Sequence, residues 1–141
     1  MDEATKNKIR GLRKNSKFAY VGSVNEEGFP QVKCMLTFKE EDVHVHHFST
    51  NTSSKRVQQF KANPKAAVYY VSELFYKGAL FTGEMEVLED NETKARFWER
   101  GDEKYYPQGV TDPDYCILRF TAKTVNYYQG LKNETIPIDE L

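Results

Sequence analysis

The residues best suited to chemistry lie together at positions 49–56, which read Ser-Thr-Asn-Thr-Ser-Ser-Lys-Arg. They lead into Val57 and Phe60, which are spaced for one face of a helix. The first N–H groups of a helix have no partner within it, and the helix dipole is positive at that end. Hydroxyls, Lys55 and Arg56 around such a helix start would bind the oxygens of a phosphate. The same residues also describe an ordinary helix cap with solvated charges, and the segment alone does not separate the two interpretations.

The glycine content of this segment limits which kind of phosphate it is expected to bind. The segment lacks the glycine pattern with which a P-loop wraps a di- or triphosphate. A terminal monophosphate is therefore favoured, and the tyrosine-rich strands predicted around it suit a ligand with an aromatic body.

Three histidines stand close together at positions 44, 46 and 47. His44 and His46 fall on one face of a predicted strand, as two metal ligands would. No cysteine lies near them in the sequence and no motif supplies a carboxylate. No metal site is expected, and the histidines are interpreted as residents of an exposed barrel face.

Motifs for catalysis by the polypeptide itself are missing from the sequence. There is no Ser-His-Asp signature, no nucleophile elbow and no carboxylate pair with a spacing typical of acid–base catalysis. Phe97 and Trp98, followed by Tyr105 and Tyr106, are more typical of core packing than of a site. If the protein is an enzyme, a cofactor is expected to supply the reactive group.

The elements that must position these residues are mostly strands. Two-residue periodicity alternates with turn residues along the chain, and a Pro-rich and Gly-containing stretch at 102–114 is expected to be a long loop. The predicted strands are Phe18–Val24, Gln31–Phe38, Val43–Ser49, Ala66–Val71, Gly78–Leu88 and Tyr115–Tyr128, and the predicted helices lie at 4–14, 55–62 and 90–101. Six strands with hairpin spacing favour a small, mainly β, antiparallel barrel with helices at its ends.

Composition limits the class of protein. The chain has 141 residues, which is one domain over 1–141, and 20 Lys+Arg against 21 Asp+Glu give a net charge of −1. Nucleic-acid binding is not expected without a positive excess. No apolar run approaches the ~20 residues of a membrane span, and the charged start lacks a signal-peptide core. A cytoplasmic protein is expected, with no membrane partner and with Cys34 and Cys116 as buried free thiols.

Taken in order, several segments resemble the pyridoxamine 5'-phosphate oxidase family. Three of them are Gly28–Met35, Phe48–Lys55 and Asn63–Ala66. Residues 82–115, which include Gly83, Trp98, Tyr105-Tyr106-Pro107, Gly109 and Asp112-Pro113-Asp114-Tyr115, are similar to the small general-stress-protein branch of that family. The resemblance covers about residues 15–128, and it rests on the order and spacing of the segments.

The resemblance implies a fold, a cofactor and a partner. The fold is a six-stranded antiparallel Greek-key split barrel of the FMN-binding type. The partner is a second copy of the chain, with each of two FMN molecules in a groove between the subunits. A small-molecule substrate, or a nicotinamide nucleotide as electron donor, is a further expected partner.

The resemblance also implies positions that contact FMN. These are Lys33, Met35, Leu36, Ser49, Thr50, Ser53, Ser54, Lys55, Trp98 and Tyr106. Lys33 would reach the FMN phosphate, and Ser54 with Lys55 would clamp it, with Arg56 beside them. The two aromatic residues would come from the partner subunit. This clamp coincides with the anion site inferred above from the residues alone.

Two departures from the oxidase separate this chain from vitamin B6 oxidation. Gly78 stands where the oxidase has a flavin-facing glutamine, so only backbone groups are expected there. The segment Leu131–Leu141 has no counterpart of the part of the oxidase that holds pyridoxal phosphate. The expected function is a flavin-dependent oxidoreductase of unknown substrate. The alternative is a protein that binds FMN or a haem-like ligand without turnover, as a carrier or stress sensor.

Overall fold

A computed structural model describes residues 1–72, 74 and 76–141. Its helices are α1 (Glu3–Asn15), α2 (Lys55–Ala62) and α3 (Asn91–Phe97). Its strands are β1 (Phe18–Val24), β2 (Pro30–Leu36), β3 (Val45–Asn51), β4 (Lys65–Ser72), β5 (Lys77–Leu88), β6 (Tyr115–Gln129) and β7 (Lys132–Pro137). The mainly β, antiparallel fold expected from the sequence is confirmed.

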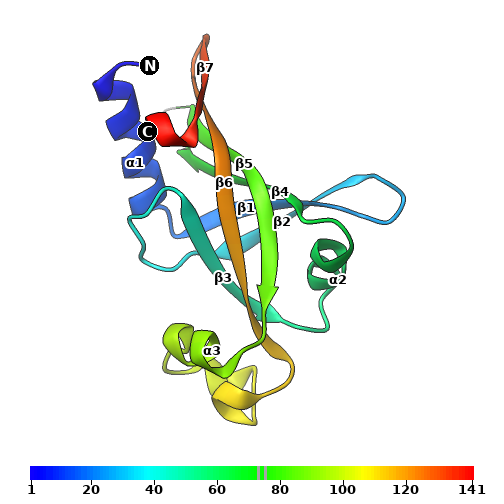
Figure 1. Cartoon of the computed structure of the whole chain (residues 1–141). Helices are drawn as coiled ribbons and strands as arrows, with labels where there is room; N and C mark the ends of the chain where they lie inside the picture. Colours follow the sequence, from blue (N-terminus) through cyan, green and yellow to red (C-terminus); the bar gives the residue numbers. More distant parts are fainter. Residues whose placement is uncertain (73, 75) are drawn as a thin grey trace.

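The strands form one sheet in the order β2-β1-β4-β5-β6-β3, and β7 pairs with β6. Every pairing is antiparallel. The long strands β5 and β6 form the spine of the molecule, and the β1–β2 hairpin projects to one side of it (Figure 1). Among the described residues no ladder joins β2 to β3, so the sheet is strongly curved but not closed.

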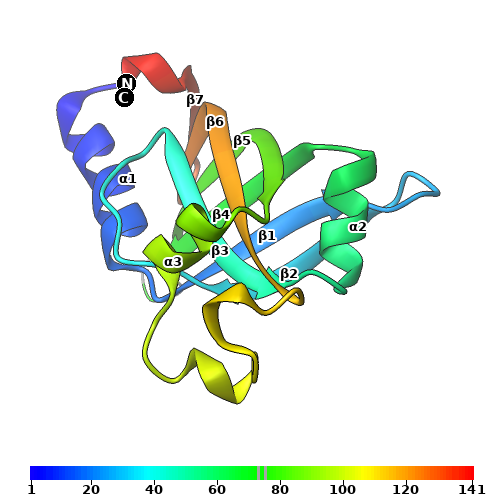
Figure 2. The ribbon, with the colours of Figure 1, turned by 60° about the horizontal axis from the view of Figure 1, so that its bottom comes forward.

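The sheet has seven strands where the sequence predicted six. The additional strand is β7, which follows a tight turn at Gly130 (φ +60°) and pairs back onto the end of β6. The chain then ends in a short 3₁₀ turn over Ile138–Glu140. The two termini lie side by side in both ribbon views (Figures 1 and 2), where Lys132 Nζ donates to Thr5 Oγ1 at 2.8 Å.

Each helix begins at a side chain that caps it. Asp2 accepts from the Thr5 N–H at the start of α1, and Asp90 accepts from the Thr93 N–H at the start of α3. Asn63 ends α2 immediately before Pro64, as expected. The apolar residues of α1 and α2, such as Ile9 and Phe60, pack into the core enclosed by the curved sheet.

The histidines do not lie on an exposed barrel face, so that expectation was wrong. β3 begins at Val45, which leaves His44 outside the strand. His46 is completely buried between the rings of Phe81 and Phe120. His47 is also buried, on the other side of the strand, because α3 covers that side and places Phe97 against the imidazole at 4.4 Å.

The two faces of the β1–β2 hairpin differ sharply in exposure. Ala19, Val21 and Met35 face the core and are buried. On the other face Val32 is 73% and Leu36 is 71% exposed, although both are apolar. Cys34 lies in that same row, so its expected burial was wrong, whereas Cys116 is buried as expected. Both thiols are free.

Within the part of the chain that is described, no helix has the length and apolar character needed to cross a membrane.

Candidate functional site

The predicted anion site is formed where β3 passes into α2. Ser54 is the N-cap of α2, and its hydroxyl accepts the Val57 N–H at 3.2 Å. The first turn of α2 contains no acidic residue, so α2 itself places no negative charge at the positive end of its dipole. The cap interpretation is therefore correct for Ser54, and it leaves the site electrostatically suited to an anion.

Asp114 holds the loop in front of α2 in place. Its carbonyl oxygen accepts the Thr52 N–H at 2.7 Å, and its carboxylate accepts the Ser53 N–H at 2.9 Å. The side chain of Asn51 donates to the Ser53 hydroxyl at 2.9 Å. Because Asp114 directly precedes β6, the helix start is anchored to the central spine of the fold. The sequence placed Asp114 in the long loop expected at 102–114 and gave no sign of this role, because Ser53 and Asp114 are 61 residues apart in the chain.

Two cations stand at the start of α2. Lys55 is its first residue and is exposed. Arg56 is half-buried, and its Nε is a buried donor without a hydrogen-bond partner among the described residues. Burial lowers the pKa of the Arg56 guanidinium, which nevertheless remains a cation at neutral pH. A buried donor without an acceptor is costly, so this group favours binding of an oxyanion.

The predicted contacts on β2 lie on both faces of that strand. Lys33 pairs with Val21 and is exposed, and Met35 pairs with Ala19 and is buried. Both therefore point to the side of the sheet on which α2 lies, where the Ser23 hydroxyl donates to Gln59 of that helix. Leu36 points to the opposite, exposed side.

The predicted contacts on β3 are also divided. Thr50 is buried, and its carbonyl oxygen accepts from the Cys116 thiol at 3.6 Å. Ser49 lies opposite Ile117 on the other face of the strand, under α3, and is half-buried. These two residues lead into the helix start, so Ser49, Thr50, Ser53, Ser54 and Lys55 follow one another along the chain, with Ser49 and Thr50 on opposite faces of β3.

Trp98 and Tyr106 lie together, at a ring-centroid distance of 6.3 Å. Both pack against the buried ring of Tyr115, at 5.1 Å and 4.9 Å. Burial raises the pKa of the Tyr106 hydroxyl to about 12. The interpretation as core packing is confirmed for both rings, because they flank a small buried cluster of Phe97, Tyr115 and Ile117. Their contact with a flavin across a subunit boundary remains a prediction. The interpretation as core packing was wrong for Tyr105, which is 75% exposed.

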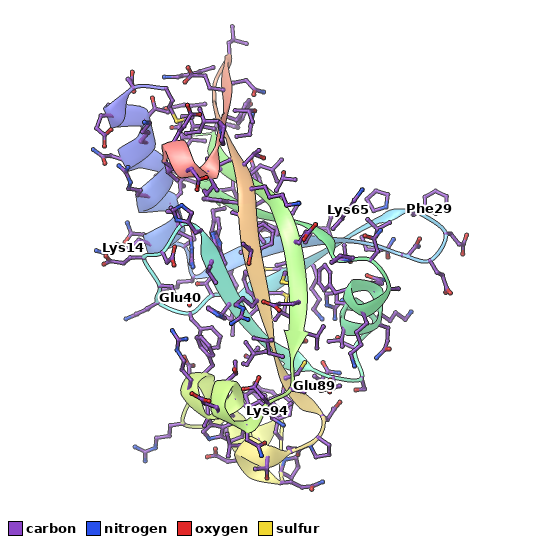
Figure 3. All side chains as sticks on the ribbon, in the orientation of Figure 1. Lys14, Phe29, Glu40, Lys65, Glu89 and Lys94 are labelled. Carbon is purple, nitrogen blue, oxygen red and sulfur yellow. The ribbon has the colours of Figure 1, made fainter. Side chains whose placement is uncertain are left out.

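A second polar cluster lies between α1, the segment before β3, and β3 itself. Arg13 is 2% exposed and donates to Glu40 Oε2 at 3.1 Å, and Glu40 Oε1 lies 2.6 Å from His47 Nδ1. Burial alone would raise the pKa of the Glu40 carboxyl, but hydrogen bonds from His47 and Arg13 outweigh it and hold the pKa below its usual value. Figure 3 labels Glu40 close to Lys14 of α1.

His46 and Tyr70 form a third polar contact, inside the core. His46 Nε2 lies 2.9 Å from the Val43 carbonyl oxygen, which can only accept, so Nε2 carries the proton. Nδ1 then accepts from the Tyr70 hydroxyl at 2.6 Å. Burial, and next to it the charge of Arg13, lower the pKa of His46 to about 3, so the ring is neutral at neutral pH. In the described part of the chain no group of three or more His, Cys, Asp or Glu side chains could hold a metal ion.

Comparison with known proteins places this geometry in a family. Residues 5–129 match the family model described as pyridoxamine 5'-phosphate oxidase. A search of curated proteins found no match.

Solved structures provide further relatives. A Clostridium acetobutylicum protein related to general stress protein 26 shares 39% identity and a TM-score of 0.89, over 99% of both chains. An FMN-binding, pyridoxamine 5'-phosphate oxidase-related protein from Nostoc punctiforme shares 12% identity and a TM-score of 0.69, over 96% of this chain and 93% of that one. A haem-binding protein from Mycobacterium smegmatis shares 11% identity and a TM-score of 0.73, over 97% of this chain and 59% of that one.

Proposed function

The chain belongs to the pyridoxamine 5'-phosphate oxidase family, and from this premise we propose that it is a homodimeric flavoprotein that binds FMN and acts as an oxidoreductase on a small substrate. The observation that carries the proposal is the unpaired positive charge at the start of α2. Arg56 offers a buried Nε–H that has no acceptor among the described residues, and Lys55 offers an exposed ammonium beside it.

These residues fit the phosphate of FMN in charge and in donor type. A phosphate monoester carries close to two negative charges at neutral pH and accepts several hydrogen bonds. It would give Arg56 Nε the acceptor that the described part of the chain does not provide, and Lys55 would supply the second charge. The helix N-terminus adds N–H groups and a favourable dipole. Asp114 holds the loop so that these donors do not have to be ordered when the ligand binds.

The exposed face of the β1–β2 hairpin supports the proposal that a second copy of the chain binds to this one. Phe18 is 54%, Val32 is 73% and Leu36 is 71% exposed, and all three lie on one side of two paired strands. An apolar row of this kind is typical of a protein–protein contact. Phe29, 61% exposed, extends it to the tip of the hairpin, which projects from the body of the molecule in Figure 3.

Bound FMN would supply the redox chemistry, since its ring system accepts and donates a hydride. The chain's own contribution is to hold the phosphate at α2 and to exclude water from the ring through the apolar face and its copy. Burial raises the pKa of Tyr106 to about 12, so its hydroxyl keeps its proton at neutral pH. The hydroxyl can therefore act as a hydrogen-bond donor.

A flavin titration tests the binding part of the proposal. Purified protein should carry, or take up, FMN with a visible absorbance spectrum that differs from that of free FMN. Riboflavin, which lacks the phosphate, should bind at least about tenfold more weakly, since one hydrogen bond to a charged group contributes about 1.5–3 kcal/mol. Equal affinities for FMN and riboflavin would contradict the proposed phosphate clamp.

Light scattering on purified protein tests the dimer. Wild-type protein should have twice the mass of the chain, and the Val32→Lys variant should shift toward the monomer because it places a charge in the apolar row. Lys123→Gln is the control, because the Lys123 side chain lies outside this row and pairs with Glu84. A monomeric wild-type protein would contradict the proposed subunit groove.

A second candidate function is binding without turnover. It is favoured by the positions of the two histidines in β3, both of which are buried and bonded to protein atoms, so that neither is placed for acid–base catalysis on a ligand. Anaerobic mixing of the FMN-loaded protein with NADH and with NADPH separates the two candidates. Bleaching of the flavin band supports the oxidoreductase, and an unchanged band with both donors supports a carrier or sensor. A haemin titration then tests whether the carried group is a haem-like ligand.

A further inference from the structure

The start of β5 contains a contact that the sequence did not predict. Gly78 pairs with Val71 of β4 and with Tyr128 of β6. A Cβ atom added to Gly78 would lie 2.2 Å from the hydroxyl oxygen of Tyr69 and 2.5 Å from its Cζ. Atoms cannot approach so closely, so the phenol of Tyr69 occupies the space that a side chain at position 78 would need.

This contact changes the expectation for Gly78. The sequence indicated that the position offers only backbone groups to a ligand. The structure instead places a side-chain hydroxyl directly over it, from the neighbouring strand. The glycine and the tyrosine therefore form one unit, because any larger residue at 78 would displace the phenol.

The phenol lies on the outer face of the sheet, in the part formed by β1 and β4, whereas α3 covers that face at β3. Tyr69 is half-buried, and its cross-strand neighbour on β1 is Tyr20, which is 37% exposed. Tyr128 flanks Gly78 on the β6 side and is 40% exposed. The apolar residues Val32 and Leu36 of β2 lie on the same face, because they continue the row of β1 residues that includes Tyr20.

The phenol is also a permanent hydrogen-bond donor. Burial, and next to it the neighbouring Tyr128, raise the pKa of Tyr69 above its ordinary value of 10.0. Its hydroxyl therefore stays protonated throughout the physiological range.

We propose that Tyr69 is a positioning residue for the flavin, and that its hydroxyl donates a hydrogen bond to the ring system in place of a side chain at position 78. This inference rests on the proposed function, because it assumes that a flavin ring lies against the open face at Gly78. Gly78 pairs with Tyr128 and the clamp adjoins Asp114, at opposite ends of β6, so the phosphate of this flavin would lie in the clamp of the second copy. It differs from a purely structural role, in which the phenol would only fill the space left by the glycine.

The hydroxyl is tested by titrating Tyr69→Phe with FMN and with riboflavin. The variant keeps the ring over Gly78 and removes the donor. We expect about fivefold weaker binding of both flavins, as for loss of one neutral hydrogen bond, and a changed visible spectrum of the bound flavin. Equal losses for the two flavins identify a contact to the ring, since a contact to the phosphate would affect FMN alone.

Tyr128→Phe is the matched control. It removes a hydroxyl from the other side of Gly78 on the same face, and we expect both flavin affinities to stay within about twofold of wild type. Thermal melting of the flavin-free variants checks that each is folded. A purely structural role of Tyr69 predicts wild-type affinity and spectrum in Tyr69→Phe, and that result would overturn the inference.

A side-chain exchange provides an independent test. Gly78→Gln alone should weaken riboflavin binding at least tenfold, because its side chain collides with the phenol. Tyr69→Ala removes the phenol, and the double variant Tyr69→Ala/Gly78→Gln should bind riboflavin more tightly than either single variant, because the glutamine amide then takes the vacated space. If the double variant binds riboflavin no more tightly than the single variant with the lower affinity, the result counts against the inference.

The outcomes separate the two proposals. If wild-type protein binds FMN and riboflavin but Tyr69→Phe does so equally well, the role of Tyr69 is wrong and the proposed function stands. If wild-type protein binds neither flavin, the proposed function is wrong and the role of Tyr69 falls with it.

Discussion

Two polar clusters in this molecule contain similar residues and differ in whether their donors are paired. Around Arg13, the guanidinium donates to Glu40 and to the carbonyl oxygens of Asp42 and Val45, and Glu40 in turn meets His47. At the start of α2, Arg56 retains a buried donor for which residues 1–72, 74 and 76–141 provide no acceptor. The first cluster is complete within the chain, whereas the second needs an anion from outside.

The difference separates two roles that a buried cation can have in this fold. A buried cation whose Nε and Nη2 donors are accepted by protein atoms connects distant segments, here α1 with the strand β3. A cation with a buried unpaired donor costs free energy in the absence of a ligand, and that cost is recovered on binding. Substitutions in the first cluster should therefore change stability, and substitutions in the second should change ligand affinity.

The largest effect is expected at Arg13. Arg13→Ala leaves the Glu40 carboxylate partly buried without its Arg13 partner, which should lower the free energy of unfolding by about 3–5 kcal/mol. Urea denaturation measures the loss. The FMN affinity of the folded protein should stay within about twofold of wild type, because the cluster does not contact the clamp. A variant as stable as wild type would show that the cluster is not structural.

The clamp should respond in the opposite way. Lys55→Ala and Arg56→Ala should each weaken FMN binding by about 1.5–3 kcal/mol and leave riboflavin binding unchanged, because only the phosphate is contacted. The unfolding free energy without ligand should not fall. Lys61→Ala is the matched control, since Lys61 is a lysine of the same helix at its other end, paired with Glu89. A loss of FMN affinity in Lys61→Ala as large as in Lys55→Ala would point to a general charge effect.

His46 gives a pH-dependent effect of intermediate size. Its pKa in the folded protein is about 3, against 6.5 for the ordinary group, so between these values the unfolded chain binds a proton that the folded chain does not. The unfolding free energy should therefore decrease as the pH falls below 6.5, by about 2 kcal/mol between pH 7 and pH 5. Above pH 7 this group should contribute no pH dependence.

Urea denaturation of His46→Gln and His44→Gln across this pH range isolates the contribution. The His46 variant should lose the dependence, and the His44 variant should retain it, because His44 is about half exposed. Identical pH profiles for wild type and the His46 variant would contradict the assigned neutral state.

The smallest effect is expected one residue from the largest. Lys14 pairs with Glu41 at 2.9 Å, with side chains 60% and 77% exposed, whereas the neighbouring Arg13–Glu40 pair is largely enclosed. Lys14→Ala should leave the unfolding free energy unchanged within the error of urea denaturation, since water screens exposed pairs. A loss comparable to that of Arg13→Ala would mean that burial is not what separates the two clusters.

The sequence by itself determined the features that depend on near neighbours. Ser54 caps α2 because its hydroxyl reaches an N–H three residues away, and Asn63 with Pro64 ends the helix for equally local reasons. The alternation in 78–88 and 115–128 was sufficient to predict strands and the mainly β fold. β7 was missed because its residues are mostly polar, and the signal that could have revealed it was the turn at Gly130 between Gln129 and Lys132.

Only the tertiary structure decided which groups are buried, paired or left open. Alternation along β2 distinguished two faces, but curvature of the sheet determined that Met35 is covered and Leu36 is not. The enclosure of His46, the anchoring of Ser53 by Asp114 and the phenol of Tyr69 over Gly78 all join residues that are distant in sequence or on different strands. Burial and hydrogen-bond pairing depend on such contacts, and no local pattern of residue types specifies them.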